Sequence, residues 1–234
     1  MSGCHAILWK YSMLKNKLFL FIYTLAVIII SSLITTACFH YFVLQPVPDK
    51  ESLISFNKDQ VRQSPIKEDN AIIEIFSYGC HYCAANEENV NKLAQKMPPG
   101  TRLIRLHFNN QSGAGLASYS SLFSTLTVMG IEPQYRQKIY EAVLQEHLNL
   151  SLPEIRDGWL KRQGIDVEAY AQASQSSEVQ ALQNYLVKVS GYYQLKATPS
   201  FIVNKKWLAL QEGKFSDFTQ QLLSLLQHDK PLEK

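Results

Sequence analysis

The apolar positions divide the chain into one continuous segment and a longer region of alternating pattern. From Leu18 to Pro48 there is no Asp, Glu, Lys or Arg, and residues 18–44 consist largely of Leu, Ile, Phe, Val and Tyr. About 20 such residues are enough to cross the apolar core of a bilayer. The pattern predicts a tail, a transmembrane anchor or signal sequence, a linker and a folded domain, with expected bounds 1–17, 18–44, 45–69 and 70–228.

Beyond residue 70, short apolar runs alternate with helical periodicity. Strands are predicted at 71–76, 101–108, 200–203 and 207–210, after a short one at 53–56 in the linker. Helices are predicted at 83–96, 116–129, 132–148, 155–163, 178–190 and 215–226. Ser151, with Glu154 three residues on, predicts the cap of the fourth helix, and Asp166 predicts the cap of one more. This order indicates an α/β fold, a small mixed sheet interrupted by a helical insertion at about 113–190.

The charges on either side of the apolar segment predict its orientation. Lys10, Lys15 and Lys17 precede it without any acid, and all 20 acidic residues follow it. Because positive charge favours the cytoplasmic side, the N-terminus is expected in the cytoplasm and the domain across the membrane. The same three lysines account for the formal net charge of +3. The domain itself is therefore near neutral, and no nucleic-acid partner is expected.

The fate of the apolar segment has two interpretations. Its length exceeds that of a usual signal core, which favours an uncleaved anchor. Thr35-Thr36-Ala37 is small enough for signal peptidase, and Cys38 after it resembles a lipoprotein site. The alternative is therefore a soluble or lipid-anchored domain, cleaved near Cys38. Met13 is a second candidate start.

The candidate chemistry lies in Cys80-His81-Tyr82-Cys83, which follows the predicted strand 71–76 and opens a predicted helix. A cysteine in the first turn of a helix lies at the positive end of the macrodipole, which favours thiolate over thiol. Cys83 lies about one turn further on, close enough to form a disulfide with Cys80. The predicted domain contains no other cysteine, as a cycling dithiol requires.

Three other interpretations compete with redox exchange. A static disulfide is possible in an oxidising compartment, but a bridge across three residues closes too small a loop to stabilise much. A metal site using Cys80, Cys83 and His81 has too few ligands for zinc, because there is no second CxxC and no HxxxH. A redox-inactive module that only binds extended peptides is the third. No metal or other cofactor is expected.

The chain resembles the DsbA-type periplasmic thiol:disulfide oxidoreductases, which have a thioredoxin fold with a helical insertion. The resemblance covers roughly residues 71–227 and includes the cysteine pair and Thr198-Pro199 before the third main strand. Further local matches are Glu74-Ile75-Phe76-Ser77, Glu87-Glu88, Leu106-His107-Phe108-Asn109, Met129-Gly130-Ile131-Glu132, Ile155-Arg156-Asp157 with Gly164-Ile165, and Pro199-Ser200-Phe201-Ile202-Val203-Asn204.

The resemblance implies an enzyme that exchanges disulfides with extended or unfolded exported proteins. A membrane or periplasmic partner would recycle the cysteine pair. The expected location is the bacterial inner membrane, with the C-terminal domain in the periplasm. Cys80 is the expected nucleophile and Cys83 the resolving thiol. Pro199 is expected to be cis, which would bring Thr198 close to the cysteines and leave its backbone free to pair with substrate.

Two further side chains are candidates for supporting roles. Glu74 lies between Ile73 and Ile75 in an apolar strand, where a buried carboxylate is costly unless it is paired or neutral. In related folds an acid beneath the disulfide relays a proton to the resolving cysteine; the alternative is that Glu74 faces solvent on an edge strand. His81 either lowers the pKa of the Cys80 thiol or is simply solvated.

Two positions depart from the family pattern. Its usual dipeptide between the cysteines is Pro-His, whereas this chain has His81-Tyr82. DsbA-type oxidases usually have Val before the proline, whereas this chain has Thr198, as isomerase and reductase branches do. Oxidase and isomerase or reductase activities both stay open at this point.

Overall fold

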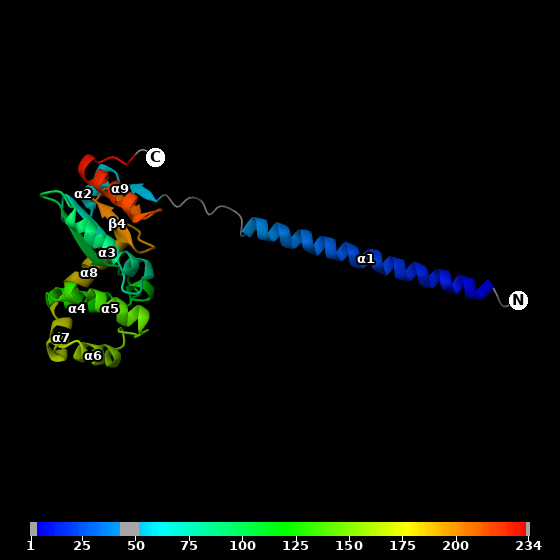
Figure 1. Cartoon of the computed structure of the whole chain (residues 1–234), viewed down its shortest axis with the longest axis horizontal. Coiled ribbons are helices and arrows are strands. Elements are labelled where there is room, and N and C mark those ends of the chain that lie inside the picture. Colours follow the sequence, from blue (N-terminus) through cyan, green and yellow to red (C-terminus); the bar gives the residue numbers. More distant parts are fainter. Residues whose placement is uncertain (1–3, 43–51, 233–234) are drawn as a thin grey trace. The chain divides into compact units, whose positions relative to one another are not determined.

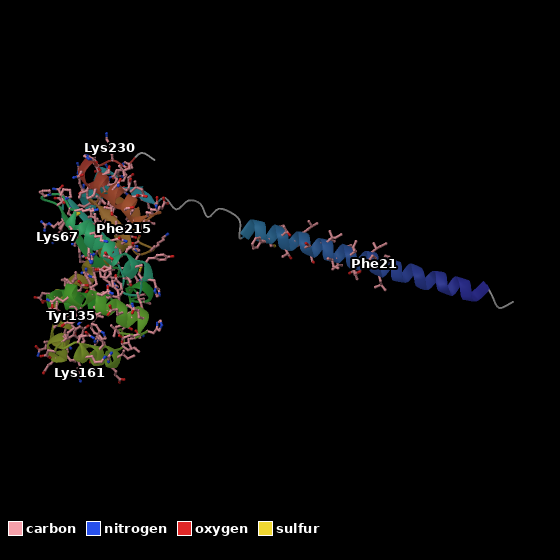
Figure 2. All side chains as sticks on the ribbon, in the orientation of Figure 1. Phe21, Lys67, Tyr135, Lys161, Phe215 and Lys230 are labelled. Atoms are coloured by element: carbon pink, nitrogen blue, oxygen red, sulfur yellow. A yellow bond between two sulfur atoms is a disulfide. The ribbon has the colours of Figure 1, made fainter. Side chains whose placement is uncertain are left out.

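The computed structural model describes residues 4–42 and 52–232, which fall into two separate units. The first unit is helix α1, Cys4–Phe42 (Figure 1). Within it, Phe19–Phe39 is 21 residues long and apolar enough to cross a bilayer. Its apolar side chains, such as Phe21, project outward from the helix (Figure 2). The last residues of the predicted segment, 43 and 44, lie outside the described residues.

The second unit contains a five-stranded sheet with the order β1-β5-β4-β2-β3. Strands β2 and β3 are parallel, and the other neighbours are antiparallel. The strands are β1 Leu53–Ser55, β2 Ala71–Phe76, β3 Arg102–His107, β4 Ser200–Val203 and β5 Trp207–Leu210. The predicted bounds of β2, β4 and β5 are confirmed. Asn204 and Lys205, both at positive φ, form the turn of the β4–β5 hairpin.

Eight α-helices are described in this unit (Figure 1). They are α2 Lys58–Gln63, α3 His81–Gln95, α4 Ser120–Val128, α5 Glu132–Tyr140, α6 Pro153–Arg162, α7 Val167–Ser174, α8 Ser177–Tyr192 and α9 Phe215–His228. Helices α4 to α8 lie between β3 and β4 in the sequence, and Figure 1 shows α4 to α7 gathered at one end of the domain. The predicted α/β, thioredoxin-like fold with a helical insertion is confirmed.

Several predicted helices differ in detail. The predicted helix 116–129 is a short 3-10 turn, Gly115–Ala117, followed by α4. The predicted helix 132–148 ends earlier, because α5 passes into a π-helical segment, Glu141–Gln145. The predicted cap at Ser151 is wrong: α6 begins after Leu152, and the Ser151 hydroxyl bonds to Asn149 instead. The Asp166 cap of α7 is confirmed.

Helix α2 lies within residues 45–69, for which the sequence predicts a linker with one strand and no helix. Asn57 accepts from the backbone N–H groups of Asp59 and Gln60, and the Gln60 side chain accepts from the Asn57 N–H. This reciprocal capping box is a recognisable helix start. Strand β1 pairs with β5, so residues from 53 onward belong to the folded domain.

The two faces of the sheet are covered by different helices, because side chains alternate along a strand. Ile72 and Phe201 pack in one cluster with Leu93 of α3 and Leu222 of α9. Ile73 and Ile75 belong to the other cluster, with residues of α8 and of the insertion. Glu74 alternates with Ile73 and Ile75 and therefore lies on the face that α3 covers. Helix α3 carries the cysteine pair at its first turn.

Candidate redox site

The cysteine pair lies where β2 leads into α3. Cys80 is the N-cap residue with extended backbone, and its sulfur accepts a hydrogen bond from the Cys83 N–H at 3.1 Å. The helix thus begins at His81, two residues earlier than predicted. Cys80 and Cys83 form a disulfide, with their Cα atoms 5.3 Å apart. The Cys80 sulfur therefore sits at the positive end of the α3 dipole, where a thiolate is stabilised.

The two sulfurs differ in access. Cys80 is 6% exposed and Cys83 is 1% exposed. Between them, His81 is exposed, and Tyr82 is 77% exposed. An incoming thiolate therefore reaches Cys80 more readily than Cys83. Cys83 is therefore the deeper of the two residues.

The Thr198-Pro199 peptide bond is cis, as predicted. The Thr198 carbonyl oxygen lies 3.3 Å from the Cys80 sulfur. The Thr198 Oγ1 atom is buried and has no hydrogen-bond partner among the described residues. The structure thus brings together the predicted residues Cys80, Cys83, Thr198 and Pro199.

Glu74 is 2% exposed and lies in β2, which is flanked by β3 and β4. The alternative that it faces solvent on an edge strand is therefore wrong. Its Oε2 lies 3.0 Å from Nε of Arg105 on β3. Burial raises the pKa of Glu74 to about 7, although Arg105 acts in the opposite direction. No hydrogen bond joins Glu74 to either cysteine in the part of the chain that the structure describes.

A neighbouring acid belongs to the same charged group. Glu87 of α3 has a largely buried side chain. It lies four residues after Cys83 on α3, and thus one helical turn away on the same side. Its carboxylate accepts from Nη1 of Arg105 at 2.6 Å. Glu74 and Glu87 therefore share Arg105, which contacts α3 one turn beyond the cysteine pair.

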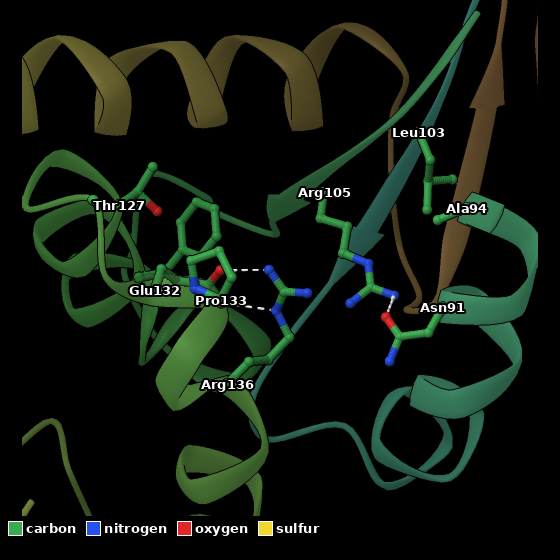
Figure 3. Close-up of a pocket in the computed structure, with 10 residues that line it drawn as sticks. Asn91, Ala94, Leu103, Arg105, Thr127, Glu132, Pro133 and Arg136 are labelled. Atoms are coloured by element: carbon green, nitrogen blue, oxygen red, sulfur yellow. Dashed lines mark hydrogen bonds and ion pairs between the residues drawn. The ribbon is translucent and has the colours of Figure 1, made fainter. Parts of the chain in front are cut away.

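The helical insertion adds a second largely buried arginine side chain to this group. Arg136 of α5 is ion-paired with Glu132, and its Nη1 lies 3.6 Å from Glu87 Oε1. Figure 3 shows Arg105 and Arg136 approaching from opposite sides of a pocket of about 490 Å³. The sequence shows Glu132 and Arg136 at the spacing of a helical ion pair, but it does not show that Arg136 also approaches Glu87.

Metal binding has little support from the geometry. Among the described residues, no three His, Cys, Asp or Glu side chains gather closely enough to hold a metal ion. His81 is exposed, whereas Cys83 is buried. The arrangement is suited to thiol–disulfide exchange, in which one sulfur is accessible and the other is protected.

The chain is similar to curated proteins and to solved structures, whereas no protein-family model matches it. The curated thiol:disulfide interchange protein DsbA of Pseudomonas aeruginosa is 28% identical over 136 residues, which cover 58% of this chain and 64% of the relative. DsbA of Azotobacter vinelandii is 30% identical over 136 residues, with coverage of 58% and 63%. The chain thus spans less than two thirds of the length of these relatives.

Solved structures agree in fold. The crystal structure of Pseudomonas aeruginosa DsbA matches with a TM-score of 0.67 and 22% identity, covering 76% of this chain and 92% of that one. The oxidoreductase NmDsbA1 of N. meningitidis matches with a TM-score of 0.61 and 21% identity, covering 70% and 86%. The chain therefore has the DsbA-type fold, and its sequence resembles that of DsbA proteins.

Proposed function

We propose that this chain, similar to DsbA proteins in sequence and fold, is a thiol:disulfide oxidoreductase that acts on exported proteins. One observation carries the proposal: the Cys80 sulfur lies at the start of α3, within hydrogen-bond distance of the Cys83 N–H and close to the Thr198 carbonyl. A structural disulfide needs neither feature. An exchanging sulfur needs both a stabilised thiolate and a place for substrate backbone beside it.

In the oxidising direction, a substrate thiolate attacks the Cys80 sulfur of the disulfide. The Cys80–Cys83 bond breaks, a mixed disulfide forms, and Cys83 leaves as a thiolate that takes up a proton. A second substrate thiolate then attacks the substrate sulfur of the mixed disulfide, which forms the substrate disulfide and releases the Cys80 thiolate. Two electrons pass from substrate to the cysteine pair. Reduction follows the same steps in reverse.

Glu74 holds the proton that Cys83 exchanges during this cycle. Two observations support this role. Glu74 lies on the sheet face that α3 covers, and burial raises its pKa to about 7, so it can both give and take a proton near neutral pH. Arg105 keeps the ionised form of Glu74 paired, so that the charge is tolerated in the core.

Thr198 and Pro199 form the substrate platform. The cis bond places the Thr198 backbone beside Cys80, where it can pair with an extended substrate segment. Tyr82, exposed beside the disulfide, offers an aromatic surface to the same ligand.

We place the protein in the bacterial inner membrane as a single-pass protein with its folded domain in the periplasm, where a redox partner reoxidises or reduces the pair. The 21-residue apolar stretch and the lysines before it support this address. Release of a soluble or lipid-anchored domain near Cys38 is the alternative. Alkaline extraction of membranes, with the mass of the mature protein, separates the two.

Two positions bear on the direction of electron flow. His81-Tyr82 replaces the Pro-His of strong oxidases, and Thr198 replaces their Val. We therefore place the potential between those of strong oxidases and those of reductases, with isomerase or reductase activity as the alternative to oxidase activity. His81, exposed in the first helical turn, supplies part of the thiolate stabilisation.

The decisive experiment measures exchange by the full chain purified in mild detergent. We expect it to catalyse insulin reduction or the oxidative refolding of a reduced protein, and Cys80→Ser to abolish both. Exchange that persists in Cys80→Ser would overturn the assignment of the nucleophile. Stoichiometric zinc without exchange would favour metal binding, and peptide binding without exchange would favour a redox-inactive module.

A further inference from the structure

The loop that carries Cys80 is held against the helical insertion. It consists of Ser77, Tyr78 and Gly79, between β2 and the N-cap of α3. The Ser77 hydroxyl donates to the Leu116 carbonyl at 2.7 Å, and the Cys80 N–H donates to the Ser77 carbonyl at 3.0 Å. The position of the nucleophilic sulfur thus depends on contacts made by the residues just before it.

Tyr78 makes two buried hydrogen bonds, one through its backbone N–H and one through its side-chain hydroxyl. Its backbone N–H donates to Nε2 of His107 at 3.1 Å, and its hydroxyl donates to Oε1 of Glu132 at 2.5 Å. The Nδ1 of His107 lies 2.7 Å from the Phe108 carbonyl, so Nδ1 carries the proton and Nε2 accepts. Burial lowers the pKa of His107 to about 4, which keeps this acceptor neutral.

Glu132 is itself fixed from a second side. Arg136 donates from Nε to Glu132 Oε1 at 2.9 Å and from Nη2 to the other carboxylate oxygen (Figure 3). The Arg136 guanidinium also lies over the Phe76 ring, 5.6 Å from its centre. A bidentate pair in a buried site has a defined geometry, and a hydrogen bond to a carboxylate is stronger than one between neutral groups. Glu132 therefore presents one fixed, charged acceptor to Tyr78.

We propose that Tyr78 and Glu132 are positioning residues, through which the helical insertion holds the Cys80 loop and sets the reactivity of the cysteine pair. The inference rests on the proposed function, since it concerns what controls the reactivity of the cysteine pair Cys80 and Cys83. Neither residue touches a sulfur in the contacts described, so both act through the loop. A hydrogen bond depends on the angle between donor and acceptor. The Cys83 N–H therefore stabilises a Cys80 thiolate only while the loop holds the sulfur in line with it.

The test compares two tyrosines in the full chain. Tyr78→Phe removes one hydroxyl and no charge. We expect it to lower the equilibrium constant for reduction of the pair by glutathione at least three-fold and to raise the pKa of the Cys80 thiol. Tyr170→Phe is the matched control, because Tyr170 is an equally buried tyrosine of the insertion, below the Arg156 guanidinium and away from the loop. It should leave both quantities unchanged.

A double-mutant cycle keeps the proposal falsifiable if one variant loses stability. Glu132→Gln weakens the acceptor, and its general charge effect cancels when it is combined with Tyr78→Phe. We expect the two substitutions to be non-additive in the glutathione equilibrium. An unshifted Tyr78→Phe, an equal shift in Tyr170→Phe, or additive effects would overturn the inference.

These measurements are independent of catalysis. The glutathione equilibrium and the thiol titration are read from the cysteine pair itself. A wild-type protein that fails in insulin reduction and refolding would refute the proposed function alone, whereas an unshifted equilibrium in an active protein would refute the positioning role alone.

Discussion

The sulfur of Cys80 lies 3.3 Å from the carbonyl oxygen of Thr198, a residue 118 positions further along the chain. The contact joins the start of α3 to the segment before β4, and the whole helical insertion lies between them in the sequence. Nucleophile and substrate platform are thus separate pieces of sequence that meet only in the folded domain.

Selective alkylation tests the asymmetry of the pair. In the reduced protein, iodoacetamide should label Cys80 before Cys83, since Cys80 is the more exposed and accepts the Cys83 N–H. The pKa of the Cys80 thiol should lie well below the ordinary ~8.5 of a free cysteine. Peptide mass spectrometry against pH measures both. Faster labelling of Cys83, or an ordinary titration of Cys80, would contradict the assignment.

Removal of the resolving thiol should trap substrates. In Cys83→Ala, the mixed disulfide on Cys80 has no internal thiol to release it. Non-reducing gels of cells that express this variant should show high-mass adducts that disappear on reduction. Cys80→Ala is the matched control and should show none. Adducts on the control variant alone would mean that the roles of the two cysteines are reversed.

The dipeptide should set part of the redox potential. The wild-type disulfide is expected to be less oxidising than the ~−120 mV of DsbA, a reference value for a strong oxidant whose reduced form is stabilised. The double substitution His81→Pro and Tyr82→His should make the pair more oxidising, by about 30 mV for a ten-fold change in the glutathione equilibrium. Proline is tolerated here because His81 is the first helical residue. An unchanged potential would mean that the rest of the site, and not the dipeptide, sets the redox potential of the cysteine pair.

Glu74 should make stability depend on pH. Because its pKa rises from an ordinary 4.5 to about 7 on folding, the native state binds more protons than the unfolded state between these values. The contribution of Glu74 to the free energy of unfolding should therefore fall as pH rises through this window, by up to about 3 kcal/mol, whereas His107, whose pKa burial lowers to about 4, contributes in the opposite sense below pH 6.5. Glu74→Gln should remove this dependence, as measured by urea unfolding at pH 5 and pH 8. Equal pH dependence in both proteins would place the raised pKa elsewhere.

The sequence allowed accurate prediction where local signals are strong. The bounds of β2, β4 and β5 agree with the predictions because turn residues flank short, mostly apolar runs. The cysteine pair was found at a strand–helix junction, and the cis bond at Pro199 was implied by the family resemblance. Helix α2 is missing from the predictions, although Asn57 and Gln60 have the three-residue spacing of a capping box.

The charged group beneath α3 could not be predicted to the same degree. Alternation along β2 gives the face on which Glu74 lies but does not identify its partner, because Arg105 is on another strand. Glu87 has the spacing of an exposed helical residue, yet two arginines make its burial favourable. Such pairings depend on the packing of distant elements, which no local pattern encodes.

The strand order also affects how the domain folds during its synthesis. Strand β2 lies between β3, its near neighbour in the sequence, and β4, which follows only after the insertion. A ribosome therefore completes both cysteines well before it makes the strand that finishes the sheet beside them. Pairings between such distant segments form late and slowly. Until then the two thiols belong to an incomplete domain, and a chaperone or an early disulfide between these near neighbours would protect them from other proteins.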